Sequence, residues 1–274
     1  EMLRSLVGSE MCIRDSFYSI YYHSFDNSNH CQYIRTEVGA IKNKIKVLSG
    51  AQLKYIAFLS MLIDHTNKAL IYPNLNGGRL NTVSDIFDII GRIAFPIFAF
   101  LLVEGFFKTR SRAKYLATLL VFGVISEVPF DLFTTKQFFE PNWNNIMFTL
   151  ALMLVTIWMI DVLKKKMEKF PKILWFLLSF VILAVMCLIA AILSLDYDYH
   201  AILIGYFYYI FHGRELIAIP FNFLSMYKEP WALLGFGLVL TYNGERGKQN
   251  KLINYLFYPV HLLILGLLRI YLGI

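Results

Sequence analysis

The chain has 274 residues, of which 57% are hydrophobic and 16% are charged. Soluble globular domains have about 45–50% apolar and about 25% charged residues, so the composition argues against a soluble domain, and also against disorder, coiled coil and collagen. The mean hydropathy of +0.54, together with 24 Phe and 17 Tyr, is typical of an integral membrane protein with aromatic belts at both interfaces. Cys12, Cys31 and Cys187 have no metal-ligand spacing, so neither a disulfide framework nor a metal site is expected.

Residues 1–40 differ in character from the rest of the chain. They contain no apolar stretch long enough to span a bilayer, and they lack the positive end, apolar core and small-residue cleavage site of a signal peptide. The opening letters, EMLRSLVGSEMCIRDS, resemble translated sequencing-adaptor sequence. We therefore expect residues 1–40 to be non-native or disordered, and the membrane domain to occupy residues 41–274.

The rest of the chain contains apolar segments that can be taken in order. Crossing ~30 Å of hydrocarbon takes about 20 apolar residues, and long candidates lie at 50–72, 86–107, 113–133, 145–163, 173–194 and 250–273. Shorter apolar pieces lie at 199–211, 215–227 and 230–242, and these are either tilted spans or re-entrant segments. The sequence predicts an all-α, polytopic integral membrane helical bundle of about nine transmembrane helices, within a range of about seven to ten.

Lys and Arg are distributed unevenly among the loops. If all the segments cross the membrane, alternate loops hold most of the Lys and Arg residues found in loops. These loops lie at 42–46, 108–114, 164–172, 214 and 246–251, whereas the opposite loops hold only Arg79, Lys136 and Lys228. The positive-inside rule then predicts a cytoplasmic amino end and an external carboxyl end. This distribution accounts for the net charge of +7. No helix-turn-helix or aromatic RNA-binding motif accompanies it, so no nucleic acid partner is expected.

Several ionisable side chains lie inside the apolar segments, where a charged group costs about 2.5–3.5 kcal/mol on insertion scales. Such residues usually face a cavity or a partner, so each is a candidate site residue. In chain order they are Asp64 and His65, then Asp88, Arg92 and Glu104, then Glu127 and Asp131, and finally His261 and Arg269. The connection after residue 194 adds Asp196, Asp198 and His200. Helical rise and topology place most of them in the outer half of the membrane, with His261 near the middle and Glu104 at the inner side.

Structural explanations compete with functional ones for these residues. Two groups have a partner four residues away that can neutralise them along one helix: Asp64 with Lys68, and Asp88 with Arg92. The 127–131 stretch can be a kinked helix end that reaches interfacial water, and His261 can be a packing residue. The adjacent pair of Asp64 and His65 is the hardest to explain in this way, because both groups lie deep in an otherwise apolar segment.

The Asp64–His65 pair suits general-base catalysis. Imidazole titrates near pH 6.5, and a carboxylate can fix its tautomer. Adjacent helical residues point about 100° apart, so Asp64 either supports His65 or orients a group on another helix. The sequence lacks a P-loop, an HExxH helix and a GxSxG nucleophile elbow.

Three stretches carry motifs that are specific in combination. They are LKYIAFLSMLIDHTNKAL, GRIAFPIFAFLLVEGFFKTRSRAKYLATLLVFGVISEVPFDLF and YNGERGKQNKLINYLFYPVHLLIL. Together they resemble the TraX family, which is named for the F-pilin acetyltransferase and belongs with the transmembrane acyltransferases. The resemblance covers roughly residues 50–270 and implies transfer of an acetyl group from acetyl-CoA to an amino group. The motif positions are Asp64, His65, Gly91, Arg92, Phe95, Pro96, Glu104, Gly105, Asn145, Asn243, Gly244, Gly247, Tyr258, Pro259 and His261.

Residues and resemblance together give a set of predicted roles. The predicted catalytic residues are His65, Asp64, Arg92 and His261, with one His as the base and Arg92 orienting Asp64 or stabilising the oxyanion. The predicted acceptor-binding residues are Glu127, Asn145, Asp198 and His200. The predicted acetyl-CoA-binding residues, on the basic loops and the NGxRG motif, are Arg110, Arg112, Lys114, Asn243, Arg246 and Lys248.

The expected function is an integral-membrane N-acetyltransferase in the bacterial cytoplasmic (inner) membrane. It uses acetyl-CoA as donor and an amine-bearing acceptor, either a pilin-like protein or a small molecule. The alternatives are a polytopic transporter or flippase that uses the buried charges as a proton relay, and a non-catalytic assembly or scaffold protein. The transporter hypothesis predicts internal repeats, and none is evident. The sequence leaves open which His is the base, the acceptor and the oligomeric state.

Overall fold

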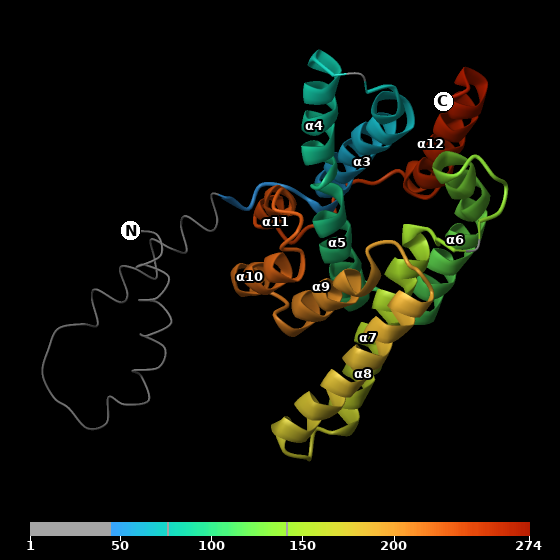
Figure 1. The fold of residues 1–274 in the computed structure, drawn as a ribbon. Helices are drawn as coiled ribbons and strands as arrows, with labels where there is room; N and C mark the ends of the chain where they lie inside the picture. Colours follow the sequence, from blue (N-terminus) through green and yellow to red (C-terminus); the bar gives the residue numbers. More distant parts are fainter. Residues whose placement is uncertain (1–44, 76, 141) are drawn as a thin grey trace, which may run out of the picture. The chain divides into compact units, whose positions relative to one another are not determined.

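The computed structural model describes residues 45–274 except residues 76 and 141. The predictions for residues 1–40 and for Cys12 and Cys31 lie outside the described residues. The described part is helical throughout, with only two isolated β-bridges. Its elements in order (Figure 1) are α3 (Gly50–Thr66), η1 (Asn67–Ile71), η2 (Tyr72–Asn74), α4 (Arg79–Gly91), α5 (Ala94–Lys108), α6 (Arg112–Thr134), α7 (Ile146–Lys166), α8 (Lys172–Ile192), α9 (Asp198–Ile210), α10 (Glu215–Ser225), α11 (Ala232–Val239) and α12 (Lys251–Leu272).

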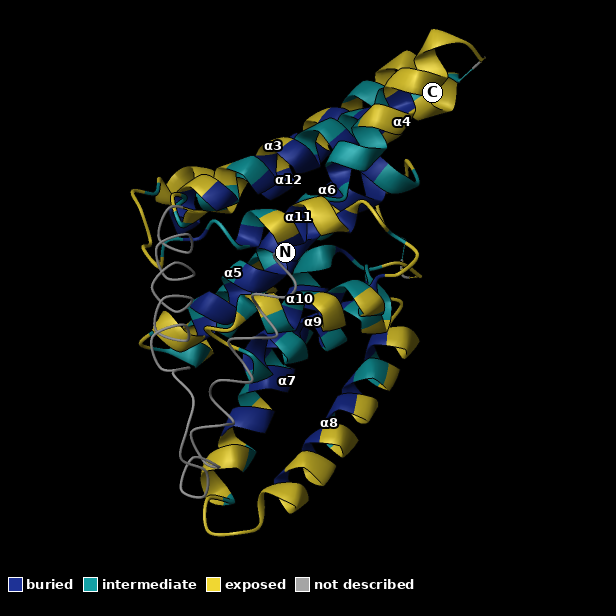
Figure 2. Cartoon of the chain, turned by 90° about the vertical axis from the view of Figure 1, so that its left-hand side faces the viewer, coloured by how far each residue is buried: buried dark blue, intermediate teal, exposed yellow. Residues whose placement is uncertain are grey.

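The all-α membrane bundle predicted from the sequence is confirmed. Among the described residues, five helical segments are long and apolar enough to cross a membrane: Arg79–Lys108, Arg112–Thr134, Ile146–Lys166, Lys172–Ile192 and Lys251–Leu272. Only 22% of the apolar window of α8 is buried, against 50% in α7. Figure 2 accordingly shows α8 exposed along most of its length. Because its exposed side chains are apolar, α8 presents them to lipid, and the structure is that of a multi-pass membrane protein.

The second predicted span is not one helix. The sequence predicts a continuous segment over 86–107, whereas the structure extends it back to Arg79 and interrupts it after Gly91. Pro96 explains the interruption, since proline lacks an N–H and its ring clashes with the carbonyl four residues earlier, here that of Arg92. The break places the Arg92 side chain at a bend between α4 and α5.

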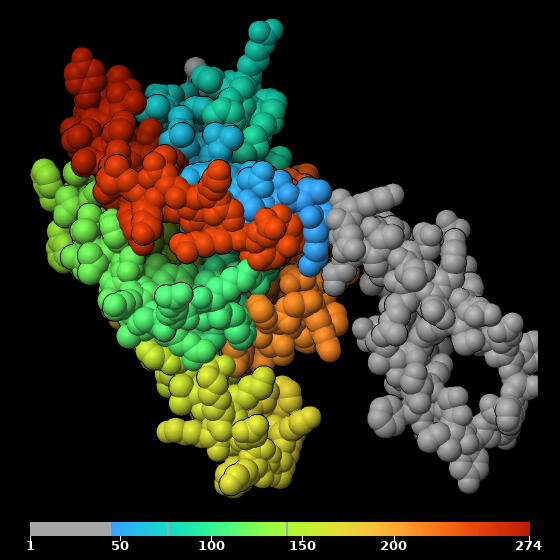
Figure 3. Space-filling model, turned by 180° about the vertical axis from the view of Figure 1, so that it is seen from behind, coloured from blue at the N-terminus to red at the C-terminus, as the bar shows by residue number. Residues whose placement is uncertain are grey.

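Contacts between distant loops show which ends of the helices lie together. Arg112, at the start of α6, binds Asp161, near the end of α7, at 2.7 Å. The backbone N–H groups of Gly50 and Ala51 donate to the carbonyls of Glu245 and Arg246, so the 243–250 loop covers the start of α3. Figure 3 shows this loop, in orange-red, against the blue start of α3. Lys108 Nζ donates to the carbonyl of Gly244 at 2.8 Å, so the basic loops at 108–114 and 243–250 lie together at one end of the bundle.

Gly235 allows α11 to approach the α4–α5 bend. A Cβ built there would lie 2.6 Å from the carbonyl oxygen of Ile93, a rigid backbone atom, whereas one at Gly237 meets nothing within 4 Å. Overpacking typically costs about 1–3 kcal/mol. We expect Gly235→Ala to lower the thermal unfolding temperature of the purified protein, with Gly237→Ala as the control on the same helix. Equal unfolding temperatures for the two variants would contradict the close approach.

Candidate functional site

A cavity of about 370 Å³ lies where α3, the α4–α5 bend, α7, α9 and α12 meet. Much of its wall is apolar and aromatic, including Phe58, Phe95, Phe98 and Phe130. Polar groups interrupt this wall at Asp64, His65, Lys68, Arg92, Asp196 and His200. An apolar cavity with a few convergent polar groups is typical of a small-molecule or catalytic site.

Two histidines from opposite ends of the sequence meet beside this cavity. His65 Nδ1 lies 2.8 Å from His261 Nε2, and the two rings are almost parallel, at an interplanar angle of 4°. The other nitrogen of His261, Nδ1, lies 2.6 Å from the carbonyl oxygen of Phe257, one turn earlier on α12. His65 lines the cavity, whereas His261 lies behind it and is only 6% exposed.

These contacts determine where the protons are. A carbonyl oxygen can only accept, so His261 Nδ1 carries a proton and donates it to Phe257. In a neutral His261, Nε2 is then an acceptor, and His65 must donate to it from Nδ1. A neutral His65 is consequently left with an unprotonated Nε2. The chain Phe257–His261–His65 thus gives His65 the tautomer that a general base requires.

Asp64 contacts Lys68 and Gly91, and no hydrogen bond joins it to His65 in the described part of the chain. Its Oδ2 accepts from Lys68 Nζ at 2.7 Å, and its Oδ1 has no hydrogen-bond partner among the described residues. The side chain packs against Gly91, where a Cβ would lie 2.4 Å from Oδ1. His65 therefore receives its support from His261, and Asp64 anchors α3 to the end of α4.

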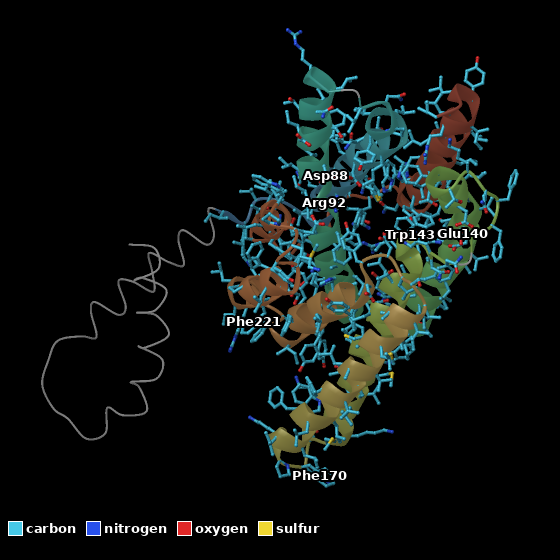
Figure 4. All side chains as sticks on the ribbon, viewed as in Figure 1. Asp88, Arg92, Glu140, Trp143, Phe170 and Phe221 are labelled. Carbon is cyan, nitrogen blue, oxygen red and sulfur yellow. The ribbon has the colours of Figure 1, made fainter. Side chains whose placement is uncertain are left out.

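Arg92 lines the cavity from the α4–α5 bend. Its Nη2 donates to Asp88 at 2.6 Å, and its Nε lies 3.3 Å from Glu229 in the loop between α10 and α11. Figure 4 labels Asp88 and Arg92 close together on this part of the ribbon. Both pairs of residues four apart in the sequence are thus formed in the structure, and Arg92 adds a link to a distant loop.

The predicted acceptor-binding residues do not all lie together. Asn145 is fully buried: its Oδ1 accepts from Met147 N at the start of α7, and its Nδ2 donates to Glu127 and to the carbonyl of Gly123. Asn145, Glu127 and Asp198 do not line the cavity, whereas His200 does. The Nδ1 atom of His200 lies 2.5 Å from the carbonyl oxygen of Ser225.

The predicted donor-binding residues lie at the other end of the bundle. The Arg112 guanidinium is engaged with Asp161 and stacks on Phe106 at 3.9 Å. Asn243 accepts from Glu245 N and so shapes the turn of the NGxRG motif. The remaining four, Arg110, Lys114, Arg246 and Lys248, are exposed and form no ion pair within the described part of the chain.

Several polar residues of the cavity were assigned no role from the sequence, among them Lys68, Asp196 and Glu229. Lys68 appeared only as a neutralising partner for Asp64, and Asp196 and Glu229 belong to short connections. Composition identifies such connections as loops and says nothing about where they fold back. Their one sequence signal was the run of polar residues Asp196, Asp198 and His200 directly after an apolar helix.

Comparison with known proteins supports the motif-based resemblance. The family model described as "TraX protein" matches residues 49–269. A relative from Dichelobacter nodosus, named as the probable fimbrial assembly protein FimC, serogroup H1, is 36% identical over 116 residues, or 40% of this chain. The match spans 45% of that relative's length, and no solved structure matches. Because the family match covers most of the chain, including both histidines beside the cavity, this chain belongs to the TraX family.

Proposed function

We propose that this chain is an integral-membrane N-acetyltransferase that moves an acetyl group from cytosolic acetyl-CoA to an amino group. The observation that carries the proposal is the His65–His261 pair, which leaves Nε2 unprotonated on His65, a residue that lines a largely apolar cavity. A fixed imidazole base is what attack by an amine on a thioester requires.

The transfer step follows from this geometry. The neutral amine attacks the acetyl carbonyl carbon, a C–N bond forms, and His65 Nε2 takes a proton from the nitrogen. The C–S bond then breaks, and the proton passes from His65 to the departing sulfur, which leaves as the CoA thiol. Arg92 lines the same cavity, and its proposed role is to stabilise the negative oxygen of the tetrahedral intermediate, a role typically worth about 3–4 kcal/mol per donor.

The two ends of the bundle suit different partners. Acetyl-CoA carries several negative charges, and the basic loops that gather at one end offer Arg110, Arg246 and Lys248. The positive-inside rule supports a cytoplasmic position for this end, and the proposal is accordingly of a bacterial cytoplasmic-membrane protein with its amino end inside. Gly50 and His65 lie about 15 residues apart on α3, which corresponds to about 22 Å of helix. In the proposal, the long, thin pantetheine arm of acetyl-CoA bridges this distance from the basic loops to His65.

A fimbrial or pilus subunit is the acceptor class that the comparisons favour. The relative from Dichelobacter nodosus is named for fimbrial assembly, and the TraX family takes its name from a pilin acetyltransferase. Modification of the amino group of such a subunit at the membrane fits both names.

The proposal is tested by incubating the purified full chain in detergent with acetyl-CoA and benzylamine. The expected products are free CoA thiol and N-acetylbenzylamine in equal amounts. Neither the transporter hypothesis nor the scaffold hypothesis predicts an acetylated amine, so its absence from a folded preparation would reject the proposed reaction.

Donor binding can be separated from topology by charge-preserving substitution. Arg246→Lys keeps the positive loop but loses the planar fork that suits bidentate phosphate contacts. Loss of one charge-assisted hydrogen bond is worth about 1.5–3 kcal/mol, so we expect the KM for acetyl-CoA to rise by about tenfold or more. Arg79→Lys, at the opposite end, is the matched control. Equal KM values for both variants and the wild type would show that Arg246 is not part of the donor site.

A further inference from the structure

The connection between α8 and α9 has an unusual backbone beside the cavity. Ser194, Tyr197 and Asp198 adopt φ values of +46°, +60° and +46°, a left-handed region that non-glycine residues rarely occupy. Each such residue costs of order 1–3 kcal/mol and persists only where its surroundings hold it in place. Three within five residues indicate that the surrounding structure imposes the shape of this loop.

The contacts that hold the loop come from two other parts of the bundle. Asn144 N donates to the carbonyl of Ser194, and Asp196 N donates to the carbonyl of Asn144, both at 3.2 Å. Thr149 Oγ1, on α7, donates to the carbonyl of Asp196 at 2.7 Å. The Tyr197 ring stacks on Phe95 of α5 with centroids 3.9 Å apart. The Asp196 side chain is thereby fixed at the cavity wall.

Asp196 differs from the other acidic residues of the cavity in forming no direct ion pair with a described residue. Asp64 is paired with Lys68, and Glu229 with Arg92. Asp196 Oδ1 accepts only from the backbone N–H of Tyr197, and it forms no ion pair with any of the described residues. Lys68 and Arg92 act on its charge from a distance, but each is paired with another carboxylate. A carboxylate held at the wall of a largely apolar cavity without a direct counter-ion is costly unless a ligand supplies the missing charge.

We infer that Asp196 binds the protonated amino group of the acceptor, so that the cavity selects a primary ammonium attached to an apolar or aromatic group. The role of the bound amine as the acetyl acceptor rests on the proposed function, whereas binding of the ammonium group by Asp196 does not. The acceptor enters as an ammonium ion, releases one proton to water to become the attacking amine, and gives a second to His65 during transfer. Asp196 is thus a substrate-binding residue, distinct from the base.

The protonation of Asp196 gives a second readout. Burial raises the pKa of this carboxyl to about 6. The other titratable groups that act on its charge are Asp64, Lys68, Arg92, Tyr197 and Tyr258. Below pH 6 the protonated form dominates and cannot pair with an ammonium ion. Ammonium binding should therefore weaken as the pH falls from 7 to 5.

Benzylamine and benzyl alcohol make a matched pair of probes, since they share shape and differ in charge at pH 7. Their affinities are measured by calorimetry on the full chain in nanodiscs, with empty nanodiscs subtracted. We expect the wild type to bind benzylamine more tightly than the alcohol, and to lose this preference by pH 5. Asp196→Asn should weaken benzylamine binding by about tenfold or more and leave alcohol binding unchanged.

Asp85→Asn is the control, because Asp85 is an exposed carboxylate on α4 that does not line the cavity. It should retain the wild-type preference. A wild type that binds both probes equally, or an Asp196→Asn protein that still prefers the amine, would overturn the inference. In the transfer assay Asp196→Asn should raise the KM for benzylamine more than it lowers kcat. Selective binding without any transfer would reject the proposed reaction and leave Asp196 as the ammonium site.

Discussion

We expect His65→Ala to lower kcat for acetyl transfer by about 10²–10⁴-fold, the usual contribution of a positioned general base, while the protein inserts and folds as before. Insertion is not expected to suffer because alanine is less costly in the membrane than imidazole. The measurement is the initial rate of N-acetylbenzylamine formation by purified protein, with unfolding temperature as the check on folding.

His212→Ala is the matched control for this prediction. His212 binds Glu104 at 2.8 Å, away from the cavity. Its loss removes an imidazole from the bundle without touching the proposed base, so kcat should stay near the wild-type value. If His65→Ala is as active as His212→Ala at equal unfolding temperature, His65 is not the base.

We expect His261→Ala to lower kcat by about 10–100-fold, by analogy with the loss of an orienting partner from a metal-binding histidine, with little change in the KM for either substrate. Without His261 nothing accepts the proton on His65 Nδ1, so the ring is free to take the opposite tautomer and lose its unprotonated Nε2. His261 is a positioning residue in this account, since it lies behind His65 and does not line the cavity.

His261→Gln separates this role from simple packing. The amide oxygen of Gln can accept from His65 Nδ1, so the variant should recover part of the lost kcat, whereas His261→Leu, with similar bulk and no acceptor, should not. Equal kcat values for the Gln and Leu variants would show that the contact with His261 is structural only.

The sequence was sufficient to predict the helices but not their breaks. Segment lengths and apolar runs located most ends of the long helices to within a few residues, because hydrophobicity over 20 residues is a strong signal. The start of the second segment, at Arg79, was missed by seven residues. The bend after Gly91 was missed although Pro96 is present, because proline is common in membrane helices and does not always interrupt them.

The candidate site was predicted in part. Asp64, His65 and His261 were identified because ionisable residues are rare in apolar segments. Their arrangement was not predictable: His65 and His261 are 196 residues apart, and nothing local reveals that they touch. Sequence adjacency suggested that Asp64 supports His65, but the helical turn directs it toward Lys68 and Gly91 instead.

The position of Asp196 at the cavity could not be predicted from the sequence. Its chemistry is visible in the sequence, but its position depends on a loop shape set by Asn144, Thr149 and Phe95, all distant in the chain. Asn145 was expected to meet the acceptor because it is a polar residue at a motif position. In the structure its oxygen caps α7, and its amide group holds Glu127, a local role that sequence alone does not distinguish from binding.

In the proposed reaction, acetyl-CoA binds at the basic end of the bundle, and its acetyl group is transferred to an amine in the cavity. This reaction is tested by reconstituting the full chain in proteoliposomes, determining its orientation by labelling Thr109→Cys, and adding ¹³C-acetyl-CoA to one side with membrane-permeant benzylamine on both. We expect labelled N-acetylbenzylamine only when the donor is on the side that exposes Thr109→Cys, and none with His65→Ala. Labelled product from the opposite side alone, or none from either side with folded wild-type protein, would contradict the proposed reaction.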